Sequence, residues 1–230
     1  LAPCRLCVYN LLTGEKTYVA EQFDSNVDAF CWAPNSRNLY FIGCWHACVN
    51  MYQTDLNGQV RQLTDDWMDF GSLQMLGNTG KILASRHSIS QADELYIVTP
   101  GKDPKKTKVQ QLTFENKAFY DQLEMGKVQE RWVQTTDGKQ MQVWVILPPH
   151  FDPNKKYPTL LFCEGGPQSP VSQFWSRLWQ LTPISSSLLT AAVCQATALS
   201  GTRLYLATGL VSAWTTTSRL STTLPTTCLT

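Results

Sequence analysis

Residues 135–175 read TTDGKQMQVWVILPPHFDPNKKYPTLLFCEGGPQSPVSQFW, and this stretch decides the fold. After an Asp137-Gly138 turn, the alternating segment Gln140–Leu147 predicts a strand. A proline-rich loop follows, and Thr159–Cys163 is then almost wholly apolar, as a strand covered on both faces requires. This strand ends at Gly165-Gly166-Pro167, where glycine permits a sharp turn. We therefore expect the opening of an α/β sheet, in which ligand sites gather beyond the strand ends.

Residues 1–125 instead predict short strands separated by turn signals such as Thr13-Gly14 and Asn57-Gly58. The pattern recurs, because VRQLT ends at Thr64 and VQQLT ends at Thr113, and each closes a strand pair that begins with an apolar–Tyr step. The separation is close to the ~40–50 residues of a propeller blade. The repeat therefore favours two blades of a β-propeller over an ordinary meandering sheet.

Both parts of the chain resemble one known family. Residues 135–175 are similar to the linker and first hydrolase strands of the prolyl oligopeptidase family of serine peptidases, in its bacterial dipeptidyl-peptidase-IV-like branch. CWAPNSRNLYFIG, at residues 31–43, is similar to a strand motif of that family's propeller blades, and LYIVTP…VQQLT resembles its blade endings. The resemblance covers roughly residues 5–176.

The resemblance implies a mainly β fold: C-terminal blades of a β-propeller, followed by the first strands of an incomplete α/β-hydrolase domain. We expect residues 1–125 to form a partial propeller, 126–178 to begin the peptidase domain, and 179–230 to be a non-native tail. For the intact family member it implies hydrolysis of peptide bonds near the N-termini of oligopeptides, without a cofactor. A periplasmic or extracellular location is also implied.

The glycine pair is the candidate site that the resemblance offers. In the family, this loop helps to form the oxyanion hole that stabilises the tetrahedral intermediate. Gly165 and Gly166 are therefore oxyanion-hole candidates, although Glu164 stands where relatives often have His or Tyr. Because an ionised carboxylate cannot donate a hydrogen bond, only backbone N–H groups remain as donors. The alternative is that the glycine pair only makes a turn.

The catalytic triad of the family is missing from this sequence. The hydrolase fold presents its serine in a Gly-x-Ser-x-Gly elbow, followed in the chain by Asp and then His. No such elbow occurs, Ser169 has the wrong spacing, and no histidine follows His150. We therefore predict that no catalytic residue of the family is present and that this chain is inactive. The alternative function is a non-enzymatic β-propeller binding module with a Ser/Thr-rich tail.

The C-terminal part of the chain has a different composition. Glu164 is the last acidic residue, and Leu181–Thr230 carries only Arg203 and Arg219 as charges, whereas soluble surfaces mix both signs. A frameshift after about residue 176 explains this composition. A set of codons that encodes SGTRLYLATGLVSAW can be chosen so that the frame one base earlier encodes EWNEAISGDWSGQCM. That shifted sequence contains the GDW-x-G segment of the family. The alternative is a glycosylated Ser/Thr/Pro-rich stalk. Because Leu1 is not Met, we also expect the chain to be cut at its front.

The charge and the cysteine content bear on whether the chain binds nucleic acid, a membrane or a metal ion. The net charge is +1 without a basic stripe, which argues against nucleic acid, and no apolar run reaches the roughly 18 residues of a membrane helix. We expect no metal, and most of the eight cysteines should be buried small hydrophobes. A zinc site remains an alternative, drawn from Cys4, Cys7, Cys44, His46 and Cys48. Cys4–Cys7 or Cys44–Cys48 disulfides would fit an exported relative, and the oligomeric state is left open.

Overall fold

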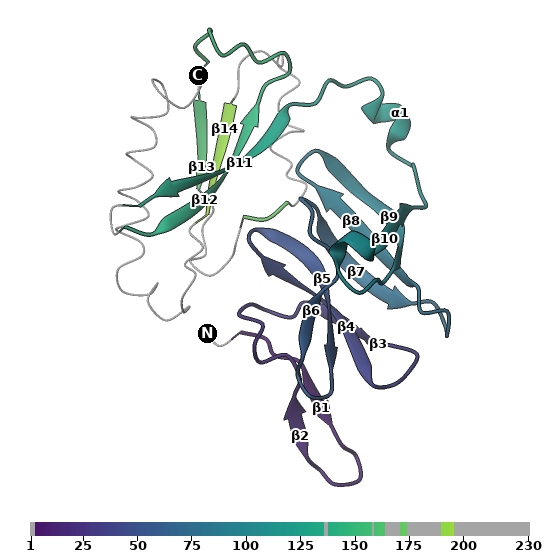
Figure 1. Cartoon of the computed structure of the whole chain (residues 1–230). Coiled ribbons are helices and arrows are strands. Elements are labelled where there is room, and N and C mark those ends of the chain that lie inside the picture. Colours follow the sequence, from purple (N-terminus) through teal and green to yellow (C-terminus); the bar gives the residue numbers. More distant parts are fainter. Residues whose placement is uncertain (1–2, 136–137, 158, 164–170, 174–189, 196–230) are drawn as a thin grey trace. The chain divides into compact units, whose positions relative to one another are not determined.

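The structure is a computed structural model that describes residues 3–135, 138–157, 159–163, 171–173 and 190–195 (Figure 1). It contains two compact units, which are described separately below. The first unit contains Leu1–Ala118 and Ser172–Trp175, and the second contains Phe119–Val171 and Ser176–Thr230. Both are built mainly from strands with little helix, as the sequence predicts. Gly165, Gly166 and the frameshift point near residue 176 lie outside the described residues.

Two four-stranded antiparallel sheets make up most of the first unit, and each follows the chain as a meander. The strands of the sheet β3-β4-β5-β6 are Ala29–Trp32, Asn38–Trp45, Cys48–Asp55 and Val60–Gln62. The strands of the sheet β7-β8-β9-β10 are Asp69–Met75, Ile82–Ser88, Gln91–Thr99 and Lys108–Gln111. A two-stranded hairpin of β1 (Cys7–Tyr9) and β2 (Lys16–Tyr18) precedes them. The expected hairpin turns are present, with positive φ at Gly14, Gly58 and Gly80.

The central strands β4 and β5 of the first sheet are buried on both faces, which explains the continuous apolar run in β4. Because side chains alternate along a strand, Tyr40 and Ile42 point to one face and Leu39 and Phe41 to the other. The first face packs against the second sheet, in a core of Ala33, Tyr40, Ile42, Met51, Leu63, Phe70, Ile82, Ala84 and Val98. The other face packs against residues from the N-terminal segment, in a core of Leu6, Val19, Ala20, Phe23, Leu39, Phe41 and Tyr52.

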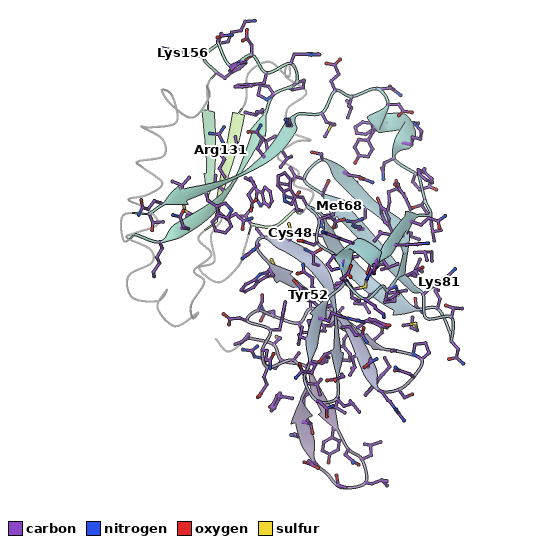
Figure 2. All side chains as sticks on the ribbon, viewed as in Figure 1. Cys48, Tyr52, Met68, Lys81, Arg131 and Lys156 are labelled. Carbon is purple, nitrogen blue, oxygen red and sulfur yellow. The ribbon has the colours of Figure 1, made fainter. Side chains whose placement is uncertain are left out.

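Three aromatic rings fill the second of these cores. The ring centroid of Phe23 lies 5.3 Å from that of Phe41 and 4.7 Å from that of Tyr52, and the Phe41 and Tyr52 rings stack at 5.3 Å. Figure 2 labels Tyr52 and Cys48, which both belong to β5. Gly43 of β4 lies against this cluster, and a Cβ there would be 2.5 Å from Cε1 of Phe23. The close packing of the ring therefore requires glycine at this position.

The second unit contains a four-stranded mixed sheet with the order β11-β12-β14-β13. Its strands are Lys127–Gln134, Gln140–Leu147, Thr190–Gln195 and Thr159–Cys163, in that spatial order. β11 and β12 form an antiparallel hairpin, β12 and β14 are antiparallel, and β13 and β14 are parallel. The chain thus passes from β12 to β13 and returns to place β14 between them, a crossover typical of α/β sheets.

The predicted bounds of two strands agree with this sheet, because β12 and β13 span the segments Gln140–Leu147 and Thr159–Cys163. Residues Met141 to Leu147 are all buried. Short helical turns occur at Pro104–Lys106, in the lysine-containing loop between β9 and β10, and at α1 (Lys117–Tyr120). No helix in the described ranges has the length and hydropathy that a membrane span needs. The proposal of a non-native tail at 179–230 is not tested, since only Thr190–Gln195 of that range is described.

Candidate functional site

The parallel strands β13 and β14 define the edge of the sheet where a catalytic loop is expected. Their register pairs Thr159 with Thr190 and Cys163 with Cys194, so both strands end at the same edge. Ligand sites in open α/β sheets lie beyond the carboxyl ends of the strands. Gly165 and Gly166 follow β13 within three residues in the sequence, and their role in an oxyanion hole stays a prediction. The positions of the two glycines themselves are not described.

Buried polar contacts mark the same edge on the neighbouring strands. Gln142 at the start of β12 lies opposite Gln195 of β14 and opposite Trp132 of β11. The Gln142 side chain is 1% exposed, and its amide donates a hydrogen bond to Oε1 of Glu130 at 2.7 Å. Because buried polar groups are costly unless they are paired, this contact fixes both side chains near the edge.

The chain becomes anchored again immediately after the glycine loop. Trp144 is buried, and its indole N–H donates to the carbonyl oxygen of Val171 at 3.2 Å. Val171 is also buried, at 4% exposure. Residues 164–170 therefore run between two fixed points of the second unit, the end of β13 and the Trp144–Val171 contact.

Ser172 and Gln173 bind a buried carboxylate of the first unit. Asp69, at the start of β7, accepts hydrogen bonds from the Ser172 hydroxyl and from the backbone N–H of Gln173. It also accepts one from the backbone N–H of Val49, at 2.7 Å. Burial raises the pKa of Asp69 above its usual value, and these hydrogen bonds oppose the rise only in part. Nothing in the local sequence around Asp69 indicated this role, since its partners lie far along the chain.

The three histidines contact carboxylate or aromatic side chains. His87 contacts two carboxylates: its Nδ1 lies 2.9 Å from Oδ1 of Asp93, and its Nε2 lies 3.9 Å from Oδ2 of Asp69. The His46 ring stacks on Trp45 with 4.9 Å between centroids. His150 is exposed, and its Nε2 lies 2.6 Å from Oε2 of Glu124. The partners of His87 and His150 are thus carboxylates, which gives neither ring the serine partner of a catalytic base.

The cysteines give no support to the zinc and disulfide alternatives. Neither the Cys4–Cys7 nor the Cys44–Cys48 disulfide is formed in the structure. Across the described part of the chain, no three His, Cys, Asp or Glu residues come together in a group that could hold a metal ion. Burial raises the pKa of Cys44 to about 12, with Asp69 and Asp28 adding to the rise. Such a thiol remains protonated near neutral pH and is a poor metal ligand.

Comparison with characterised proteins identifies the relatives of this chain. It is 45% identical to dipeptidyl-peptidase 5 of Porphyromonas gingivalis over 178 residues, which cover 77% of the chain and 25% of that protein. It is 39% identical to dipeptidyl-peptidase 5 of Porphyromonas endodontalis over 143 residues, or 62% of the chain and 20% of that protein. The chain is related to the dipeptidyl-peptidase-like peptidases of the prolyl oligopeptidase family. No protein-family model matches it.

Solved structures of similar fold agree with this relationship. Acylaminoacyl peptidase of Pyrococcus horikoshii superposes with a TM-score of 0.65 at 18% identity, over 83% of this chain and 27% of that one. Dipeptidyl peptidase 4 of Porphyromonas gingivalis superposes with a TM-score of 0.59 at 16% identity, over the same shares of the two chains. At this identity the likeness concerns the fold alone. The chain spans about a quarter of the length of the curated bacterial relatives it matches.

Proposed function

We propose that this chain is a segment of a dipeptidyl-peptidase-like serine peptidase, whose intact form removes dipeptides from the N-termini of oligopeptides. The observation that carries the proposal is the 45% identity with a dipeptidyl-peptidase 5 over 77% of the chain. Two structural features support it. The two successive sheets of the first unit suit neighbouring propeller blades, and the β11–β12 hairpin followed by β13 suits the beginning of an α/β hydrolase.

The proposed domains are a partial propeller at 1–125, the start of the peptidase domain at 126–178, and a non-native tail at 179–230. The change from the first compact unit to the second, between Ala118 and Phe119, lies close to the first of these boundaries. The match with the Porphyromonas gingivalis protein leaves about a quarter of the chain outside it, which is compatible with a foreign tail. The proposed frameshift supplies a cause for that tail.

In the proposed reaction, a serine attacks the peptide carbonyl, a histidine accepts the serine proton, and the negative charge that develops on the carbonyl oxygen needs donors. Gly165 and Gly166 are proposed to supply backbone N–H groups to that oxygen. Their place supports this role, since they follow β13 at the carboxyl edge and precede the anchored Val171. Removing one such donor from a hydrolase costs roughly 100- to 1,000-fold in rate.

We propose that the 230-residue chain does not itself catalyse this reaction, because its sequence offers no Gly-x-Ser-x-Gly elbow and no histidine after His150. The test is release of p-nitroaniline from a panel of dipeptidyl-p-nitroanilides by the purified chain, with the Porphyromonas gingivalis dipeptidyl-peptidase 5 assayed in parallel. We expect no rate above that of buffer. Turnover that copurifies with the chain would refute the inactive-fragment proposal. Binding of the dipeptidyl-p-nitroanilides, which have no free carboxylate, without turnover would favour a binding module instead.

The frameshift is tested directly by the nucleotide sequence around the codons for Ser176 to Trp179. We expect that the frame one base earlier encodes a hydrolase strand, an Arg-Gly loop and the GDW-x-G segment in that order. If that frame contains early stop codons or an unrelated sequence, the composition of residues 179–230 needs another explanation.

A further inference from the structure

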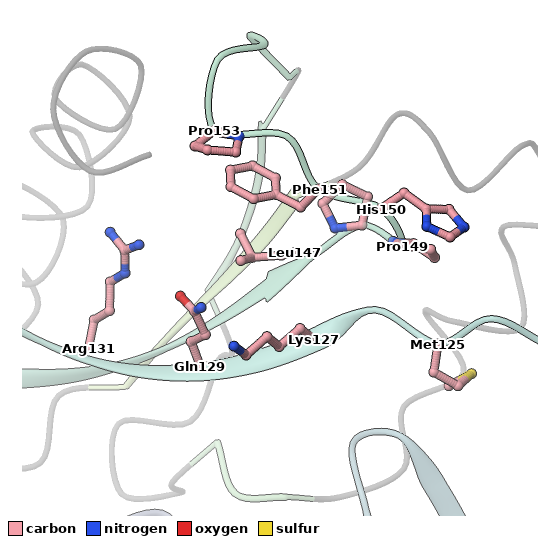
Figure 3. Close-up of a pocket in the computed structure, with 10 residues that line it drawn as sticks. Met125, Lys127, Gln129, Arg131, Leu147, Pro149, His150, Phe151 and Pro153 are labelled. Atoms are coloured by element: carbon pink, nitrogen blue, oxygen red, sulfur yellow. The ribbon is translucent and has the colours of Figure 1, made fainter. Parts of the chain in front are cut away.

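The second unit contains a pocket that is separate from the candidate active-site edge. Its volume is about 490 Å³, within the range of small-molecule sites. The residues that line it are Met125, Lys127, Gln129, Arg131, Leu147, Pro148, Pro149, His150, Phe151 and Pro153. Figure 3 shows this site, with β11 along one side and the loop after β12 along the other.

The strand register shows that the pocket lies at the opposite edge of the sheet from the glycine loop. Lys127 and Leu147 pair at the start of β11 and the end of β12. Leu147 lies next to Ile146, which pairs with Ala191 near the beginning of β14. The carboxyl ends of β13 and β14 lie at the other edge, near Gln142 and Val143. A ligand in this pocket would therefore not occupy the proposed oxyanion loop.

One side of the pocket is polar and positively charged. Lys127, Gln129 and Arg131 occupy alternate positions of β11, so their side chains share one face at intervals of about 6.6 Å along the strand. Figure 3 shows the polar ends of Lys127, Gln129 and Arg131 following one another along this strand. The ionisable residues that line the pocket are Lys127, Arg131 and His150. The Nε2 atom of His150 lies 2.6 Å from Oε2 of Glu124. Lys127, at the start of β11, therefore supplies the positive charge on which the proposed recognition depends.

The other side is apolar and rigid. Leu147, Pro148, Pro149, Phe151 and Pro153 supply its surface, and the prolines have a fixed φ. The Phe151 ring packs on Tyr157 at 5.1 Å between centroids, and Tyr157 Oη accepts a hydrogen bond from the N–H of Asp152 at 2.9 Å. A wall that is already ordered lowers the entropic cost of binding.

We propose that this pocket binds a carboxylate that carries an apolar group, such as the C-terminal residue of a short apolar peptide. The Lys127 ammonium binds the carboxylate, and the side-chain amide of Gln129 donates a second hydrogen bond. The apolar group packs on Leu147 and Phe151. The pairing of a charged donor with a carboxylate provides the preference for the acid over its neutral amide. The site is independent of catalysis, because none of its residues belongs to the proposed oxyanion loop.

The test measures equilibrium binding to the full 230-residue chain by ligand-observed saturation-transfer NMR and titration calorimetry. The probes are 3-phenylpropanoate and 3-phenylpropanamide, which contain no peptide bond, and N-acetyl-Ala-Ala-Phe with its C-terminal carboxamide. We expect each acid to bind roughly tenfold more tightly than its amide, as one charge-assisted hydrogen bond provides. Tighter binding of the peptide acid identifies a peptide C-terminus as the preferred source, and equal binding of the two acids identifies a small free acid.

The variant Lys127→Met keeps the aliphatic stem and removes the charge, so we expect the preference for the acid to disappear. Lys139→Met is the matched control, because Lys139 is an exposed lysine at the far end of the β11–β12 hairpin. It should keep the full preference. Equal binding of acid and amide by the unmodified chain, or an unchanged preference in Lys127→Met, would overturn the proposal. The dipeptidyl-p-nitroanilide assay does not affect either outcome, so this proposal and the proposed function can fail separately.

Discussion

Thr64 and Thr113 hold equivalent positions at the closing strands of two successive sheets. Each hydroxyl oxygen accepts a backbone N–H at 2.9 Å, from Met51 and Leu95 respectively. Each threonine hydroxyl also donates a hydrogen bond to the side chain just before that N–H in the chain. Thr64 donates to Oδ1 of Asn50 at 2.8 Å, and Thr113 donates to Oε2 of Glu94. The repeat of sequence is therefore a repeat of hydrogen bonds. These hydrogen bonds connect the residue that follows the last strand of each sheet to the neighbouring strand, β5 or β9.

The glutamine of each repeat completes this arrangement. The side-chain amides of Gln62 and Gln111 donate to the carbonyl oxygens of Thr64 and Thr113, in both cases at 2.8 Å. The second sheet carries a charge in place of the neutral Asn50. Burial tends to raise the pKa of Glu94, but hydrogen bonds from Thr113 and Asn116 outweigh it, so the net pKa lies below the usual value. Glu94 is thus held ionised by donors that surround it.

The first prediction concerns this closing hydrogen bond. Thr113→Val keeps the shape of the side chain but removes the hydroxyl, so the buried Glu94 loses one donor and the N–H of Leu95 loses its acceptor. We expect a loss of about 1–3 kcal/mol in the free energy of unfolding, measured by urea denaturation. Thr13→Val in the exposed hairpin turn is the control, and it should cost less than about 0.5 kcal/mol. Equal effects of the two variants would contradict the role given to Thr113.

The second prediction concerns Gly43, which leaves space for the Phe23 ring. A Cβ at this position would lie 2.5 Å from Cε1 of Phe23 and 2.6 Å from the carbonyl oxygen of Asn26. Gly43→Ala should therefore force the ring and the backbone to move, at a cost of about 1–3 kcal/mol in the free energy of unfolding. The measurement is the urea midpoint, with Phe23→Leu as a companion variant that creates space on one side only. An unchanged midpoint in Gly43→Ala would show that the core is packed more loosely than described.

The third prediction concerns the reactivity of the cysteines. Burial raises the pKa of Cys31 to about 11 and that of Cys44 to about 12, whereas Cys4 and Cys7 are exposed. Because the thiolate is the reactive form, iodoacetamide at pH 8 should modify Cys4 and Cys7 and leave Cys31 and Cys44 unmodified in the folded chain. Peptide mapping by mass spectrometry gives the extent at each site. Protection of Cys4 and Cys7 that disappears on reduction would instead indicate a disulfide between them.

Local sequence patterns predicted the hairpins, the repeat and the bounds of β12 and β13, because each depends on neighbouring residues. Alternation and apolar runs specify where a strand lies, and glycine turns specify where it ends. The equivalence of Asn50 and Glu94 was also present in the sequence, since each precedes the apolar–Tyr step of its repeat. It was missed because the two residues differ in charge.

Long-range features of the site were not predictable in the same way. The position of β14 between β12 and β13 depends on pairing with strands far away along the chain. The contact of Asp69 with Ser172 and Gln173 joins two segments that are far apart in the sequence, and no periodic pattern in the sequence predicts it. The family resemblance supplied the candidates Gly165 and Gly166, and their role stays a prediction. The structure adds the strand end that precedes them and the contacts that follow.

The last prediction tests the buried charge at Asp69. Because burial raises the pKa of Asp69 in the folded chain above its usual value of 3.8, the folded state binds this proton more tightly than the unfolded state. The contribution of Asp69 to stability is therefore largest below pH 3.8 and falls as the pH rises through its folded-state pKa. Asp69→Asn removes this titration, so its stability relative to the unmodified chain should improve as the pH rises from about 4 through the folded-state pKa of Asp69, by at most about 1.4 kcal/mol per pH unit.

The measurement is urea denaturation of both chains at several pH values, combined with hydrogen exchange at Gln173. Asp93→Asn is the matched control, since Asp93 also faces His87 but is 61% exposed. In Asp93→Asn the amide of Gln173 should exchange as it does in the unmodified chain, because Asp69 is retained. The amide of Gln173 should exchange faster in Asp69→Asn, because a neutral amide oxygen is a weaker acceptor than a carboxylate. A stability difference that is flat with pH, together with unchanged exchange at Gln173, would mean that Asp69 neither carries a buried charge nor holds the segment after the glycine loop.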